Sequence, residues 1–548
     1  MHNNKGIVGA LVGGAIIFVI LSFIAFYPAY HLTREAPPDT YYTKPHFLLQ
    51  DYYQYLSMMK QGRSGISGRN RYTTEPFEPH HLHIYYELLG RLAQTIGITD
   101  PMMYYGGIAV GLFLFVLAAI LFITTLVPRG YRLLAGLFVF LASPLPGWWI
   151  PVFGTKIYLG TDVWTKTDLL QRHAMVPHHM MGVSLTLLAT WFLLRFIDRK
   201  KLVDAGVAAC LYSTAAVVFA VPVVLFGGAF CVLSVFYGAG YGILLLKKRV
   251  SIRILLSRLQ KERTLCVGVG MTGILTFCTL FFFVLNQSRI TEIADMEYQL
   301  SRYEQFPYLF SVFILSHGIL LLFYPFALWR IKRAPVFREL FLVALTMTPW
   351  IWYILSGYIP LVNKFRLVFT SPYLFGGILA TLGVITIVQR VKKKFRGLFL
   401  FGVTALILAT TAGGILYWVS ETTNSNDRYT NIYIPVKNLE AVGYLDTQTP
   451  KFSRVFSTFY TGMYLPAFSN AVVYVGQEMN PNFNEKFALS EQFFQGTMPV
   501  FEAGQLLKDQ AIDYVFWDGA KPPDLYNDYL KEVFRNESAT IFQVVNIP

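Results

Sequence analysis

Long apolar runs separated by short polar segments make up most of the chain. A run of about 20 residues is long enough to cross a hydrocarbon core of roughly 30 Å as an α-helix. Windows of that length predict membrane spans near residues 6–28, 103–126, 133–152, 178–197, 203–221, 223–246, 265–285, 307–329, 339–357, 367–389 and 397–418. The pattern therefore predicts an α-helical polytopic membrane protein with about eleven transmembrane helices.

Basic residues are concentrated in every second short loop. These loops read VPRGYR, RFIDRKK, KKRVSIRILLSRLQKER, RIKRAPVFRE and RVKKKFR. Because Lys and Arg resist translocation, we expect a multi-pass protein of the plasma or inner membrane with a cytoplasmic N-terminus and an extracytoplasmic C-terminus. The net charge of +14 arises largely in such loops, so it does not indicate a nucleic-acid partner. A composition of 54% hydrophobic and 14% charged residues excludes an ordinary soluble domain of 548 residues.

Two segments are too long and too polar to be simple connections, residues 29–102 and residues 419–548. We expect both to be extracytoplasmic. In the first, LLQDYYQYLSMMKQG and LHIYYELLGRLAQTIGI carry apolar residues at three- and four-residue spacing, which predicts amphipathic helices against the outer membrane surface. The predicted domains are therefore a transmembrane domain over 1–418, including this loop, and an extracytoplasmic α/β domain over 419–548.

The predicted C-terminal domain has the pattern of a small α/β fold. FSRVFST, AVVYVG, IDYVFWDG and ATIFQVVNI are typical of strands, and VFEAGQLLKDQ is typical of a helix. Strands that alternate with a helix favour an open sheet covered by helices.

Asp51 is the first residue that suggests chemistry. It is a lone acid in QDYYQYLSMMKQG, shortly after the first span. An acid just outside the bilayer can accept a proton from an incoming hydroxyl or amine nucleophile. The alternative is that Asp51 caps a helix that begins at Tyr52.

A second group of polar residues follows in EPFEPHHLH, which contains Glu75, Glu78, His80, His81 and His83. Acids and imidazoles at this density suit a divalent metal, a phosphate or proton transfer. The spacing does not identify a metal site, so an interfacial loop with solvated imidazoles is the other interpretation.

A third group lies in RHAMVPHHMMG, before and at the start of the fourth span. Arg172, His173, His178 and His179 combine a guanidinium fork with imidazole donors, a set that suits a phosphate. A purely structural interpretation is that these side chains anchor the helices at the interface.

A fourth group is the short loop YIPLVNKFRLVF between the ninth and tenth spans. Lys364 and Arg366 place two positive charges in a loop expected outside, where such charges are uncommon. A lipid-linked phosphate would compensate them. The alternative is that both side chains reach ordinary headgroups.

Together these features resemble the membrane glycosyltransferases of the GT-C superfold, especially a bacterial branch of the dolichyl-phosphate-mannose and arabinosyltransferase type. The shared pattern is a first span, an outer loop that opens with an acid before YYQYL, the segment EPHHLHIYYELLGRLAQTIGI, further spans and an outer tail. Two departures are Tyr52 in place of a second acid and Gln477 where many members have a His. The first leaves open whether a divalent metal is needed.

The resemblance implies an enzyme that takes a sugar from a polyprenyl-phosphate carrier and passes it to a glycan, lipid or protein acceptor on the outer face, among membrane lipids. It implies that Asp51 is the catalytic base and that Arg366 holds the carrier phosphate. The predicted substrate site consists of the base Asp51, the phosphate-binding residue Arg366 and seven further residues. These are Lys364, Arg172, His178, His179, Glu78, His80 and His81. The alternatives are a transporter or lipid flippase, which would carry ionisable groups near mid-membrane, and a receptor whose tail binds a partner.

Overall fold

The computed structural model describes most of the chain as helices. The described residues are 4–45, 49–76, 79, 83–143, 176–230, 233, 260, 262–285, 313–314, 317–333, 336–355, 372–423, 432–478, 480, 482–519, 526 and 528–545. They fall into two compact units. The membrane unit contains residues 1–26, 108–285 and 300–422, and the loop–tail unit contains residues 27–107 and 423–548.

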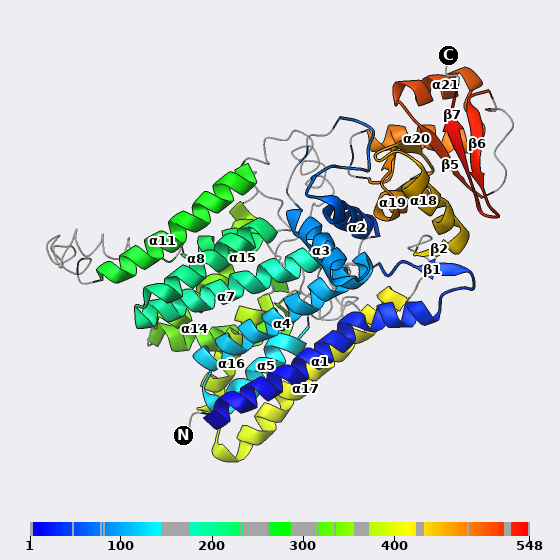
Figure 1. Cartoon of the computed structure of the whole chain (residues 1–548). Helices are drawn as coiled ribbons and strands as arrows, with labels where there is room; N and C mark the ends of the chain where they lie inside the picture. The colour runs from blue at the N-terminus through cyan, green and yellow to red at the C-terminus, as the bar shows by residue number, and fades with distance from the viewer. Residues whose placement is uncertain are drawn as a thin grey trace. The chain divides into compact units, whose positions relative to one another are not determined.

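The described part of the membrane unit is built from helices, most of them long and apolar (Figure 1). They are α1 (Asn4–Arg34), α4 (Asp100–Leu126), α5 (Arg132–Gly136), α7 (Pro177–Arg199), α8 (Leu202–Val218), α11 (Arg263–Leu280), α14 (Tyr324–Arg333), α15 (Phe337–Leu355), α16 (Pro372–Val388) and α17 (Arg396–Thr423). Helices α1, α4 and α17 extend from this unit into the other.

The helices agree with the predicted spans as far as they are described. Among the described residues, five helices are long and apolar enough to cross a membrane, at Val12–Arg34, Asp100–Leu126, Pro177–Arg199, Arg263–Phe283 and Lys393–Ala412. Three shorter apolar helices lie at Leu202–Val218, Ala220–Phe230 and Tyr373–Val388. Several predicted spans, among them 133–152, 223–246 and 307–329, lie partly outside the described residues. The figure of about eleven spans therefore stays a prediction.

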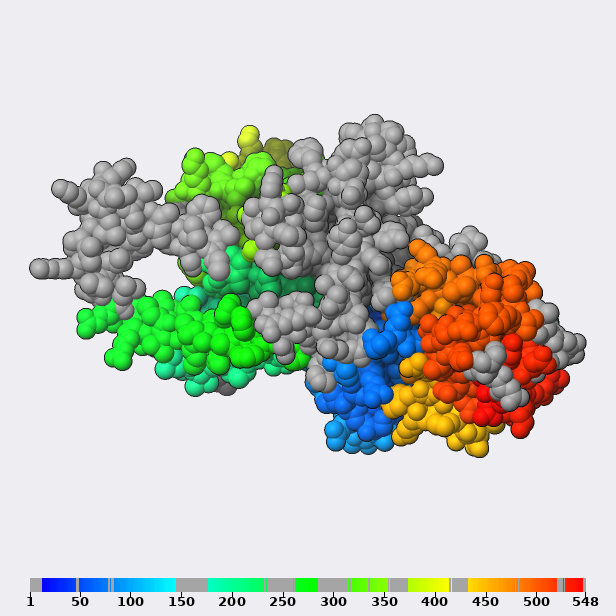
Figure 2. All heavy atoms as spheres, turned by 90° about the horizontal axis from the view of Figure 1, so that it is seen from above, coloured from blue at the N-terminus to red at the C-terminus, as the bar shows by residue number. Residues whose placement is uncertain are grey.

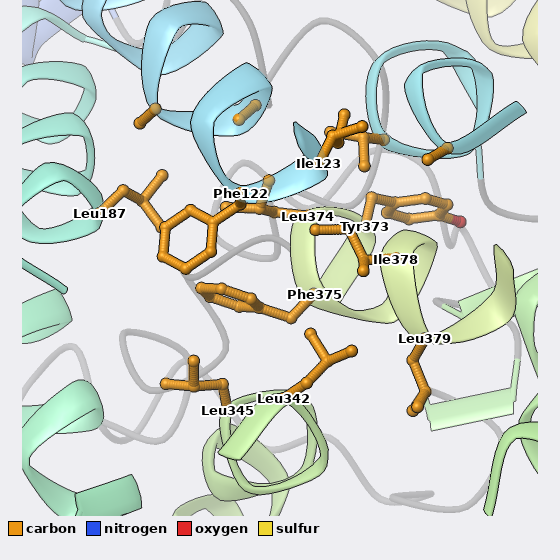
Figure 3. Close-up of a cluster of buried hydrophobic side chains, with 14 of the residues drawn as sticks. Phe122, Ile123, Leu187, Leu342, Leu345, Tyr373, Leu374, Phe375, Ile378 and Leu379 are labelled. Carbon is orange, nitrogen blue, oxygen red and sulfur yellow. The ribbon is translucent and has the colours of Figure 1, made fainter. Parts of the chain in front are cut away.

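The core of the membrane unit is apolar and aromatic. Figure 3 shows Phe122 of α4 and Phe375 of α16 facing one another among leucines from α7 and α15. Their ring centroids are 5.4 Å apart in an edge-to-face arrangement, which aromatic pairs prefer. Lipid chains are as apolar as these side chains, so close packing rather than burial from water holds such helices together.

The loop–tail unit contains a mixed five-stranded sheet in the order β4-β3-β5-β7-β6 (Figure 1). The strands are β3 (Arg454–Phe456), β4 (Val472–Val473), β5 (Tyr514–Asp518), β6 (Leu530–Arg535) and β7 (Ala539–Val544). Strands β4, β3 and β5 are parallel, whereas β7 is antiparallel to both β5 and β6. The helices are α18 (Val436–Gln448), α19 (Phe459–Phe468), α20 (Phe483–Phe494) and α21 (Val500–Asp509). The four predicted strands and the predicted helix are present, and α18, α19, α20 and β6 were not predicted.

Both amphipathic helices expected in the first loop are present, as α2 (Leu49–Ser64) and α3 (Ile84–Ile96). Helix α2 packs against α3 and against α19 of the tail. Figure 2 shows the atoms of the first loop, in blue, directly against those of the tail, in gold and orange. Most of α2 is consequently buried.

Backbone pairing joins the first loop to the tail at several places. Strand β1 (Thr40–Tyr42) pairs antiparallel with β2 (Tyr433–Pro435). The amide N–H of Val473 donates to the carbonyl of Arg71 at 2.9 Å, and Thr73 forms an antiparallel bridge with Val475. The first loop and the tail therefore form one compact unit, while the domain boundary at 418/419 stays a prediction.

Buried tyrosines make the stability of this unit sensitive to alkaline pH. Burial raises the pKa of the phenols of Tyr53, Tyr72 and Tyr464 well above the usual range. In the unfolded chain a phenol ionises near pH 10. Above that pH the unfolded chain binds fewer protons than the folded chain, so stability falls by about 1.4 kcal/mol per pH unit for each such tyrosine.

We expect the free energy of unfolding to be insensitive to these groups below about pH 10 and to fall steeply above it. Tyr53→Phe should make the fall of the free energy of unfolding with pH less steep, by the contribution of one tyrosine. Tyr460→Phe, which removes a 48% exposed phenol, should leave that slope unchanged. Denaturant titrations of the full chain followed by near-ultraviolet circular dichroism measure this. Parallel curves for Tyr53→Phe and the wild type would contradict the expectation.

Candidate functional site

Asp51 lies inside the first turn of α2 and is half-buried. The helix begins at Leu49, so the alternative interpretation, in which Asp51 caps a helix that begins at Tyr52, is wrong. A carboxylate in the first turn of a helix is stabilised by the helix dipole.

Tyr52 and Tyr53 follow Asp51 directly. Both hold the start of α2 in place by hydrogen bonds to Thr43. The hydroxyl of Tyr52 donates to the carbonyl of Thr43 at 2.6 Å, and the hydroxyls of Tyr53 and Thr43 hydrogen-bond at 2.9 Å. The amide of Thr43 in turn donates to the carbonyl of Ile432 at 3.0 Å. Both tyrosine side chains are fully buried, so the direction of Asp51 is set by a helix turn that cannot easily rotate.

Tyr55 anchors α2 to α3. Its ring stacks on Tyr86 with centroids 4.1 Å apart and meets the edge of His83 at 5.7 Å. Tyr55 follows Asp51 by four residues, and side chains at this spacing lie on the same face of a helix. The structure thus places one imidazole of the second predicted group beside the face of α2 that carries Asp51.

The half-buried face of α2 is lined by amides. Gln50, Asp51 and Gln54 share this face, whereas the intervening tyrosines are buried. Nε2 of Gln477 donates to Oε1 of Gln54 at 3.1 Å, and the backbone N–H of Glu478 donates to Oε1 of Gln50 at 3.0 Å. Residues from the tail therefore contact the amides on both sides of the predicted base. We call Gln50, Asp51, Gln54 and Gln477 the amide face.

A fixed turn presents Gln477 to α2. The N–H of Asn480 donates to the carbonyl of Gln477 at 3.2 Å and closes the turn. The buried side chain of Asn480 donates to the carbonyl of Tyr72 at 2.6 Å and accepts from Nδ2 of Asn70 at 3.0 Å. Both ends of the turn are consequently held by the first loop.

Arg71 is the largest fully buried side chain described and connects α2 to the tail. Its guanidinium donates to the carbonyl and hydroxyl of Ser57 in α2 and, at 2.8 Å, to the carbonyl of Ser469. Burial lowers the pKa of Arg71 to about 10, which still leaves it charged at neutral pH. A buried charge with three hydrogen bonds fixes the distance between the two segments.

Glu75, from the second predicted group, is used in an ion pair. One carboxylate oxygen lies 3.1 Å from Nζ of Lys486 in α20, and Nζ also donates to the hydroxyl of Thr73 at 2.9 Å. Burial lowers the pKa of Lys486, and the neighbouring Glu75 opposes that shift. Among the described residues, no group of three or more His, Cys, Asp or Glu could hold a metal.

His178 and His179 lie in the first turn of α7, in the membrane unit. Their ring centroids are 4.1 Å apart, and both rings pack on Phe219. A helix N-terminus with imidazoles is a suitable place for a phosphate. The other predicted site residues lie outside the described part of the chain: Glu78, His80, His81, Arg172, His173, Lys364 and Arg366.

The sequence did not identify Arg71, Asn480 or Lys486 as parts of this arrangement, and it noted Gln477 only as a departure from a family pattern. Each pairs with a residue some 400 positions away or bridges two distant segments. One local signal was available: the Gly- and Arg-rich loop RSGISGRNR next to two aromatic-rich helices.

Comparisons with known proteins find similarity in the fold and not in the sequence. No family of proteins matches the sequence, and a search of curated proteins finds no match. Among solved structures, the oligosaccharyltransferase AglB of Archaeoglobus fulgidus aligns over 92% of this chain and 69% of its own, with 11% identity and a TM-score of 0.51. A structure of the arabinofuranosyltransferase AftD from Mycobacteria aligns over 98% of this chain, with 13% identity and a TM-score of 0.55. Both have the GT-C fold.

The chain has the GT-C fold. At such low identity the likeness extends to architecture and not to individual residues. The AglB structure was determined with an inhibitory peptide and a dolichol-phosphate. This chain spans 42% of the length of AftD. The GT-C fold confirms the resemblance inferred from the sequence and agrees with the helical, multi-pass architecture.

Proposed function

We propose that this protein is a membrane glycosyltransferase. It transfers a sugar from a polyprenyl-phosphate-linked donor to an acceptor on the outer face of the membrane, with Asp51 as general base. The observation that carries the proposal is the placement of Asp51: it is the one acid on the half-buried face of a helix whose neighbouring tyrosines are all anchored. The GT-C fold and the dolichol-phosphate bound to AglB support the class of donor.

In this mechanism Asp51 takes the proton of the acceptor's nucleophile as that nucleophile attacks the anomeric carbon. The bond from the anomeric carbon to the phosphate oxygen breaks, and the polyprenyl phosphate leaves with the electron pair. Negative charge grows on the phosphate in the transition state, so cations that hold it lower the barrier. No nucleotide is needed.

The donor phosphate is assigned to Arg366 and Lys364, with Arg172 and the imidazoles of His178 and His179. The adjacent imidazoles at the start of α7 support this assignment, because helix N–H groups and imidazoles both donate to phosphate oxygens. Glu78, His80 and His81 are assigned to the same substrate site. A divalent metal at these residues remains a proposal that metal analysis of the purified protein tests.

The phosphate assignment predicts a specific kinetic change. Arg366→Gln removes a fork of donors that suits a phosphate, so we expect the KM for donor to rise at least about tenfold, the cost of one charge-assisted interaction. Purified full chain in lipid nanodiscs, given radiolabelled undecaprenyl-phosphate-linked mannose or arabinose and a mixture of saccharide, peptide and lipid acceptors, measures the transfer.

Lys393→Gln is the matched control for this experiment. It removes one positive charge from a loop predicted to lie on the cytoplasmic side and should leave the KM unchanged. An unaltered KM in Arg366→Gln would reject the phosphate assignment. Failure of the wild type to transfer either sugar to any acceptor would count against the proposed function itself.

A further inference from the structure

The side chain of Gln477 uses only half of its hydrogen-bonding capacity. Its Nε2 donates to Gln54, but among the described residues its Oε1 has no hydrogen-bond partner, although the residue is only 5% exposed. A buried acceptor without a donor destabilises the folded protein. A group that donates to Oε1 would therefore be bound favourably.

The amide of Gln477 lies at the predicted reaction site. Its partner Gln54 follows Asp51 by three residues on the half-buried face of α2, and Gln50 lies one turn before Gln54 on the same face. The turn at residues 477–480 is held by the first loop. Gln477 is therefore presented in a fixed position against Gln54, which lies about one helical turn after the proposed base.

We propose that the amide face binds a neutral, polyhydroxylated acceptor, namely a glycan, whose hydroxyl donates to Oε1 of Gln477. The inference rests on the proposed function, because Asp51 on the same face would activate a hydroxyl of that glycan. Of the three acceptor classes that the resemblance allows, glycan, lipid and protein, this inference selects the glycan. Gln477 is on this view a specificity-determining residue.

The chemistry of the face supports a glycan. A primary amide offers a donor and an acceptor side by side, which complements sugar hydroxyls that both donate and accept. Asp51 and the exposed Glu478 place negative charge there, so an anionic acceptor would be repelled. A lipid chain needs an apolar groove, whereas the described side chains of this face are amides and carboxylates. A site built on hydrogen bonds also rejects analogues that lack the matching hydroxyl.

Binding to the full chain in nanodiscs tests this inference without turnover. The probes are fluorescent oligosaccharides that end in mannose, arabinose, rhamnose, galactose or N-acetylglucosamine, and the readout is fluorescence anisotropy. We expect at least one probe to bind and Gln477→Met, which keeps the shape of the side chain, to weaken it about five- to tenfold. Gln54→Met should weaken it similarly.

Gln61→Met is the matched control. Gln61 is a buried glutamine of the same helix, and the described hydrogen bonds of its amide go to residues 67 and 69 of the first loop. Its loss should lower the melting temperature and leave the Kd of the saccharide unchanged. Hydrogen exchange on the wild type adds a measure that needs no variant: the bound probe should slow exchange at residues 477–480 and in the first turn of α2.

Three results would overturn the inference: no probe binds, Gln477→Met binds as tightly as the wild type, or a peptide or a polyprenol displaces the saccharide from α2. The result for Asp51→Asn separates this inference from the proposed function. That variant should transfer no sugar but should still bind the saccharide, because the amides of Gln54 and Gln477 stay in place. If it transfers sugar normally, the base assignment fails, although the acceptor site stands.

Discussion

Asp51→Asn is expected to abolish sugar transfer while leaving the protein folded. A positioned general base contributes about 10²- to 10⁴-fold to the rate, and an amide of the same shape cannot accept the proton. The change should appear in kcat and not in the KM for donor, because the donor phosphate is assigned to other residues. Transfer of labelled sugar by the full chain in nanodiscs measures both constants.

Asp39→Asn is the control for this experiment. Asp39 is exposed, lies in the same first loop and has a φ of 60°, a conformation that Asn tolerates as well as Asp. It should transfer sugar at the wild-type rate. Asp51→Glu keeps the carboxylate but displaces it by one methylene, so it should retain more activity than Asp51→Asn. Normal transfer by Asp51→Asn at normal expression would reject Asp51 as the base.

Gly90→Ala is expected to separate α2 from α3 and so to displace the helix that carries Asp51. A Cβ atom at position 90 would lie 1.8 Å from the carbonyl oxygen of Met59, and a Cβ at position 62 would lie 1.9 Å from that of Glu87. The two helices therefore cross backbone to backbone through a reciprocal pair of glycines. Because the obstacle is backbone, no rotamer change relieves it, and we expect a loss of about 3 kcal/mol, at the upper end for overpacking.

The measurement is hydrogen exchange of α2 peptides together with thermal unfolding of the full chain. Gly443→Ala is the control: a Cβ at that position in α18 meets no atom within 4 Å, so the replacement should stabilise by about 0.5–1 kcal/mol through helix propensity. If Gly90→Ala protects the amides of α2 from hydrogen exchange as well as the wild type does and has the same melting temperature, α2 and α3 do not cross so closely.

Elements whose signal is local could be predicted from the sequence alone. Apolar runs near 20 residues predicted the helices at Asp100–Leu126 and Pro177–Arg199, since hydrocarbon thickness fixes their length. Three- and four-residue spacing predicted α2 and α3, and the lone acid before YYQYL directed attention to Asp51. The resemblance to GT-C enzymes, now supported by the fold, also came from short local motifs.

The distant residues that meet on α2 could be identified only from the folded structure. Gln54 and Gln477 are separated by 423 positions, and Arg71 and Ser469 by 398. Neither helix periodicity nor loop composition carries information at such separations, because hydrogen bonds of this kind depend on how α2 docks on the tail. The same docking changed the interpretation of α2, which the sequence presents as an amphipathic surface helix and which the structure buries between α3 and α19.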